Sequence, residues 1–114
     1  MSGNEIQKQL DCFYSQNQLE QAYQFLLQEL QNAMDKEDDL IVLMLLSELI
    51  GYYRVTAQFQ YGNMIVNQAL KILKAKNLEE TVHGATTFIN IATLYRVQGK
   101  YQEALQFYKK TEKI

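Results

Sequence analysis

The sequence predicts an all-α domain built from three consecutive pairs of helices. Proline is absent from the 114 residues and only five are glycine, a composition that favours helices. Apolar residues recur at intervals of three and four along most of the chain, which is the pattern of an amphipathic helix. The chain also matches itself at offsets of 40 and 42 residues, and repeats of such length are typical of helical arrays.

The internal repeat is clearest between the middle and the last third of the chain. Segment 53–59, YRVTAQF, aligns with segment 95–101, YRVQGKY, at an offset of 42 residues (95 − 53). A weaker copy lies 40 residues before the middle one, and its apolar positions are Ile6, Leu10, Phe13, Leu19, Ala22 and Leu26. We therefore expect one domain over residues 1–114 with units at about 3–36, 39–76 and 79–114. Whether the third unit is truncated stays open.

Each unit should contain two helices joined by a short turn. The periodicity predicts helices over about 3–16, 18–34, 39–56, 58–75, 79–97 and 100–113. Gly99 and Asn77 can take the left-handed conformation that ends a helix. Turns this short make the two helices of a unit antiparallel neighbours.

The third unit resembles the tetratricopeptide repeat family through Phe88-x2-Ile91-Ala92-x2-Tyr95, then Gly99, Tyr101 and Ala104-x3-Tyr108. The second unit keeps this pattern with a large Ile50 and a small Gly62, and we expect one to make room for the other. The units are longer than the usual length of about 34 residues, and the proline that often closes a unit is missing. The resemblance implies a right-handed α-solenoid whose first helices line a concave groove.

The resemblance also implies which residues would contact a peptide in that groove. The main candidates are Met44, Glu48, Arg54, Thr86, Asn90, Thr93 and Arg96, and the wider set adds Asn4, Gln7, Lys8, Asp11, Tyr14, Ser15, Ser47, Gly51, Val55, Ile89 and Val97. In each unit these positions share one helix face. An asparagine amide can bond a peptide backbone and an arginine can fork onto a carboxylate. The competing interpretation is a solvated polar face.

The preferred function is a protein-interaction module that binds a protein or peptide. Two alternatives stay open, the receptor part of a peptide-sensing regulator and a self-assembling homo-oligomeric scaffold. For the scaffold, Leu105 and Phe107 predict a twofold contact through the C-terminal end, because they spread apolar surface over the last helix. No acid/base pair or nucleophile constellation is visible, so an enzyme is not expected.

Composition argues against several other classes. A net charge of −2 does not favour nucleic acid, although residues 1–39 carry eight acids and two bases and residues 40–114 carry five acids and nine bases. No apolar run approaches the 20 or so residues of a membrane span. Cys12 is the only cysteine and is expected to be a small buried hydrophobe. We expect no cofactor, no metal and, with no signal-peptide pattern, a cytoplasmic location.

The tyrosines divide into two groups by position. Tyr53, Tyr95, Tyr101 and Tyr108 lie on the apolar stripes and are expected to pack in the core. Tyr14, Tyr23, Tyr52 and Tyr61 lie off those stripes, so the sequence leaves them freer to meet a partner.

Overall fold

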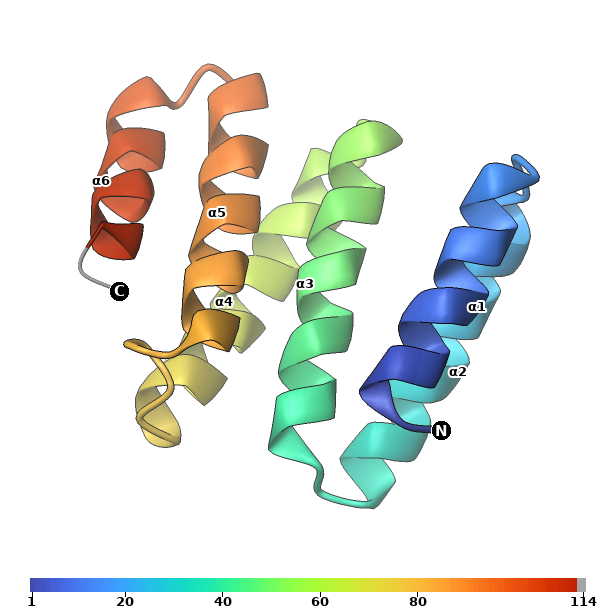
Figure 1. Ribbon diagram of the computed structural model, residues 1–114. Coiled ribbons are helices and arrows are strands. Elements are labelled where there is room, and N and C mark those ends of the chain that lie inside the picture. Colours follow the sequence, from blue (N-terminus) through green and yellow to red (C-terminus); the bar gives the residue numbers. More distant parts are fainter. Residues whose placement is uncertain (113–114) are drawn as a thin grey trace.

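The computed structural model describes residues 1–112, and within that range the chain forms six helices and no strand (Figure 1). The helices are α1 (Gly3–Ser15), α2 (Leu19–Asp35), α3 (Asp39–Val55), α4 (Phe59–Ala75), α5 (Val82–Val97) and α6 (Tyr101–Thr111). They are paired along the chain as α1–α2, α3–α4 and α5–α6, which fits a helical repeat. The all-α prediction is confirmed. The predicted end of the last helix, residue 113, lies outside the described residues.

Every turn between consecutive helices is built on one residue with a left-handed backbone: Asn17, Glu37, Ala57, Asn77 and Gly99. The residue that follows it donates its N–H to a carbonyl five positions earlier, at 2.8–3.0 Å in all five turns. This is the hydrogen bond that closes a Schellman motif. The left-handed residues recur every 20 positions until the last interval, which is 22 (99 − 77). The change of sequence offset from 40 to 42 therefore arises in the connection between α4 and α5.

That connection corrects the predicted start of α5. The helix begins at Val82 and not near residue 79, because Thr81 caps it. The Thr81 hydroxyl accepts the N–H of Gly84 at 3.1 Å and donates to the carbonyl of Leu78 at 2.6 Å. Gly84 packs so tightly on this loop that a Cβ there would overlap the Leu78 carbonyl oxygen and lie 2.7 Å from that of Glu79.

The first helices of the second and third pairs are buried on two faces, one against their own partner and one against the preceding pair. Tyr52 of α3 stacks on Tyr23 of α2, with ring centroids 4.6 Å apart. Its repeat equivalent in α5, Leu94 (94 − 42 = 52), lies over Gly62 of α4 at 3.1 Å from an added Cβ. The sequence suggested that Ile50 fills the space beside Gly62. The structure shows that Leu94 and Tyr53 fill it instead.

Three other expectations are wrong because burial depends on whether a neighbouring helix pair covers the residue. Tyr52, expected to lie free on the surface, is only 9% exposed, because it covers the preceding pair. Cys12 occupies the equivalent position in α1 (12 + 40 = 52), where no described helix covers it, and it is exposed. Tyr101 was expected in the core, yet it is 69% exposed at the start of α6, because no described helix lies beyond that pair.

The helix pairs are not spaced evenly. α3 packs closely against α5, and the side-chain amide of Asn90 donates to the Ser47 hydroxyl at 2.5 Å across that junction. α1 packs against α2 and approaches α3 much less closely. The junction between α1 and α3 is therefore the open one.

Among residues 1–112 no helix combines the length and the apolar character that crossing a membrane requires.

Candidate functional site

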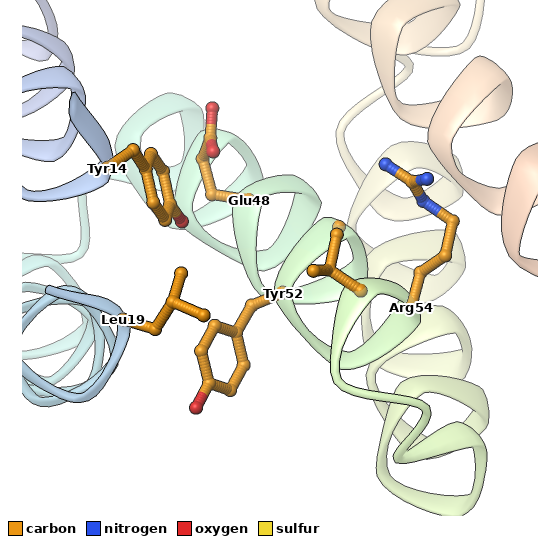
Figure 2. A pocket seen from close by; sticks show the side chains of 7 residues that line it. Tyr14, Leu19, Glu48, Tyr52 and Arg54 are labelled. Atoms are coloured by element: carbon orange, nitrogen blue, oxygen red, sulfur yellow. The ribbon is translucent and has the colours of Figure 1, made fainter. Parts of the chain in front are cut away.

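A cavity of about 260 Å³ lies at the open junction between α1 and α3. We call it the α1–α3 cavity, and its walls are Tyr14, Leu19, Glu48, Gly51, Tyr52, Arg54 and Val55. Figure 2 shows Tyr14 from α1, Leu19 from α2 and Glu48 and Tyr52 from α3 projecting towards one another. Gly51 contributes only backbone to its wall, and an added Cβ there would meet no atom within 4 Å.

The cavity combines an apolar lining with one half-buried carboxylate. Tyr14, Leu19, Tyr52 and Val55 supply carbon surface, and Glu48 supplies the charge. Within the part of the chain that the structure describes, the sole ion pair joins Lys76 to Asp39 at 3.3 Å, so Glu48 has no cationic partner there. Burial raises the pKa of the Glu48 carboxyl, and the nearby charge of Asp11 adds to the rise. A positive charge in the cavity would lower this pKa and so oppose both effects.

Tyr14 experiences the same environment from the opposite wall. Burial raises the pKa of its phenol, with smaller contributions from Glu48, Tyr52 and Asp11. Its hydroxyl therefore stays protonated at neutral pH and can donate a hydrogen bond to a carboxylate or carbonyl oxygen.

Arg54 also lines this cavity but directs its charge elsewhere. In Figure 2 its guanidinium group lies apart from Tyr14 and Glu48. Its repeat equivalent is Arg96 (96 − 42 = 54), which is exposed on α5. Neither arginine takes part in an ion pair within residues 1–112.

A second, smaller cavity of about 120 Å³ continues along the same face of α3 towards α5. Its walls are Gln7, Leu43, Met44, Ser47, Glu48, His83, Thr86 and Thr87, so Glu48 belongs to both cavities. The two hollows follow the face that the sequence assigned to a groove. Of the predicted contact residues, Met44, Glu48, Arg54 and Thr86 lie in these walls.

Two of the other main candidates, Asn90 and Thr93, make bonds inside the protein. Asn90 bonds Ser47, as described above, and the Thr93 hydroxyl donates to the Ile89 carbonyl at 2.8 Å and lies 3.1 Å from the Tyr108 hydroxyl. Arg96 is exposed and lines neither cavity. Their part in binding stays a prediction.

The two residues assigned to an oligomer contact have different surroundings. Leu105 is 53% exposed on α6. Phe107 is half-buried, with its ring centroid 5.6 Å from that of Tyr95 and 6.0 Å from that of Phe88. Phe107 therefore holds α6 against α5, and Leu105 is the better placed of the two for a contact between copies.

Leu19 and Tyr52 are the residues of the α1–α3 cavity that are absent from the predicted groove. Tyr52 had a signal in the sequence, because α3 has more apolar residues than one stripe can hold. Leu19 had none, because it lies at the start of a second helix, and only the spacing of α1 and α3 brings it to the cavity.

Within residues 1–112 the structure groups no three histidine, cysteine or acidic side chains in a way that could hold a metal ion. No family model, curated protein or solved structure matches the chain.

Proposed function

We propose that the chain is a tetratricopeptide-like interaction module, a right-handed solenoid of three repeats that binds an extended segment of a partner protein. The segment would lie across α1, α3 and α5. The observation that carries the proposal is the pair of hollows along this face, which share Glu48. Apolar walls with a few polar groups of fixed position are the usual make-up of a binding site.

The regular turns support the repeat part of the proposal. The left-handed residues recur every 20 positions from Asn17 to Asn77, so α2, α3 and α4 have the same length of 17 residues and the same exit geometry. Stacked units of this kind present their first helices side by side as one extended surface. We also propose a cytoplasmic location, since an exposed free thiol at Cys12 suits a reducing compartment.

A peptide-display selection on the intact chain tests the proposal. Selected peptides should shift backbone resonances of α1, α3 and α5 in NMR spectra. Gly51→Leu should weaken their binding about tenfold or more by filling the larger cavity, whereas Gln68→Leu on the exposed face of α4 should not. Peptides that map to α2 and α4, or that bind Gly51→Leu as well as the original chain, would contradict the proposal.

A second candidate, self-association through the third pair, is favoured by the exposed apolar side chains Ile89, Val97, Tyr101 and Leu105. Exposed apolar surface of this kind marks contact sites. It would make the chain a scaffold.

A further inference from the structure

We infer that the α1–α3 cavity receives a lysine or arginine side chain of the partner, with its aliphatic stem against Tyr14, Tyr52 and Val55 and its charge beside Glu48. This inference rests on the proposed function, because it names the chemistry of the segment that would be bound. It follows from the size, the charge and the aromatic lining of the cavity, taken in turn.

The size fits one side chain better than a small molecule. Cavities that enclose drug-sized ligands or cofactors measure about 300–1,000 Å³. The α1–α3 cavity measures about 260 Å³ and is partly open to solvent, so a side chain of a bound segment could enter it. Gly51 keeps one wall flat, because nothing lies within 4 Å of where its Cβ would be.

The charge selects a cation. Glu48 is half-buried, and no described residue pairs with its carboxylate, so its negative charge loses hydration without an ionic contact in return. Asp11 from α1 adds a second negative charge nearby, and the guanidinium of Arg54 lies apart from Glu48 and forms no ion pair with it. An acidic side chain would be repelled here. A purely apolar one would desolvate Glu48 further without relieving it.

The lining selects a long side chain with a cation at its end. Lysine and arginine lay their methylene stems along carbon surface and keep the charge at the tip. The rings of Tyr14 and Tyr52 offer such surface, and a cation over a tyrosine face gains further stabilisation. Arginine should bind more tightly than lysine, because its planar guanidinium can stack on a ring and fork onto a carboxylate together.

Small probes test this chemistry without any knowledge of the partner. n-Butylguanidinium carries the stem and charge of arginine, and n-butylurea is its neutral match. Titrated into the intact chain and followed by NMR, the first should shift the Gly51 amide and the Tyr14 ring, with about tenfold higher affinity than the second. Glu48→Gln should remove that preference, whereas Glu103→Gln, an exposed acid on α6, should retain it. Equal binding of the two probes by the original chain would overturn the inference.

The peptide selection separates this inference from the proposed function. Enrichment of arginine or lysine, with affinity about tenfold lower for Glu48→Gln, supports both. Peptides that occupy the α1, α3 and α5 face with no basic preference overturn the inference and leave the proposed function standing. A chain that binds butylguanidinium at Glu48 but selects no peptide at all overturns the proposed function, and with it the peptide origin of the cation.

Discussion

At the scale of single residues, two helical glycines differ in whether a side chain would fit at their position. Gly84 touches the carbonyl oxygens of the preceding loop, whereas Gly51 faces open space. We expect Gly84→Ala to lower the free energy of unfolding by about 1–3 kcal/mol, because backbone must move to admit the methyl group. Gly51→Ala should instead raise it by up to about 1 kcal/mol, since alanine favours the helix. Urea unfolding followed by circular dichroism measures both, and equal effects of the two changes would contradict the packing around Gly84.

Glu48 should make the stability of the fold depend on pH. Burial and Asp11 raise its pKa in the folded chain above the value in the unfolded chain. The folded state then holds the proton more tightly, so this carboxyl adds stability at low pH, which is lost as pH rises through the raised pKa. Glu48→Gln should therefore stabilise the fold at neutral pH. The advantage should shrink as the buffer is acidified towards the ordinary glutamate range.

Unfolding curves of the two proteins at several pH values measure this difference. A constant difference at every pH would show that Glu48 is fully hydrated in the folded chain. A carboxylate that lowers stability in the free protein and is relieved by a cation is what a binding residue requires.

At the scale of elements, the five turns share one geometry but not one residue type. Gly99 takes a left-handed backbone without a steric penalty, whereas Ala57 takes it at a cost of about 1–2 kcal/mol. Ala57→Gly should raise the free energy of unfolding by about 0.5–1 kcal/mol, after the greater entropy of glycine in the unfolded chain is subtracted. Gly99→Ala should lower it by a similar amount. Opposite signs in thermal unfolding are the expected result, and a loss of stability in both would show that Ala57 makes contacts that offset its strain.

The helices could be predicted from sequence because their ends are encoded locally. Stripes of apolar residues and turn residues placed most boundaries within one or two positions of the structure. The start of α5 was misplaced although Thr81 and Gly84 are suitable capping and close-contact residues, because the acids at 79 and 80 resemble a first turn. The error came from two competing local signals.

Which first helices are buried on a second face could not be predicted in the same way. Cys12, Tyr52 and Leu94 occupy equivalent positions, yet the first is exposed and the other two are buried. Their burial depends on whether another pair lies alongside, which no local pattern specifies. The α1–α3 cavity has the same origin, since it depends on how far apart two helix pairs settle. The sequence therefore indicated the helix face on which the two cavities lie, but not the position of the larger one.

At the scale of the whole molecule, the two junctions between pairs share one contact position on the second helix of the preceding pair. Ser47 and Asn63 of the second pair bond Asn90 and Gln98 of the third, the latter through two hydrogen bonds of 2.9 and 3.1 Å. In the first pair the position equivalent to Asn63 is Tyr23 (63 − 40), which packs on the second pair. These positions therefore define the surface that one pair presents to the next.

In the third pair this surface is apolar and uncovered. The equivalents of Ser47 and Asn63 are Ile89 and Leu105 (47 + 42 and 63 + 42), which are 45% and 53% exposed. The covered positions of the second pair are polar, whereas the exposed positions of the third pair are apolar. Apolar side chains on an exposed surface are poorly suited to contact with water alone. A twofold contact between two copies would bury Ile89 and Leu105 of each against the other and close the assembly.

We therefore expect sedimentation at micromolar concentration to show dimer. Leu105→Glu should shift it towards monomer, because a charge would be buried in the contact without a partner. Gln68→Glu, exposed on α4, adds the same charge outside the third pair as a control and should leave the dimer intact. Phe107→Glu would be a poor test, since Phe107 packs on Phe88 and Tyr95 and its loss would loosen α6 itself. A chain that remains monomeric at every concentration would show that water covers Ile89 and Leu105 at little cost.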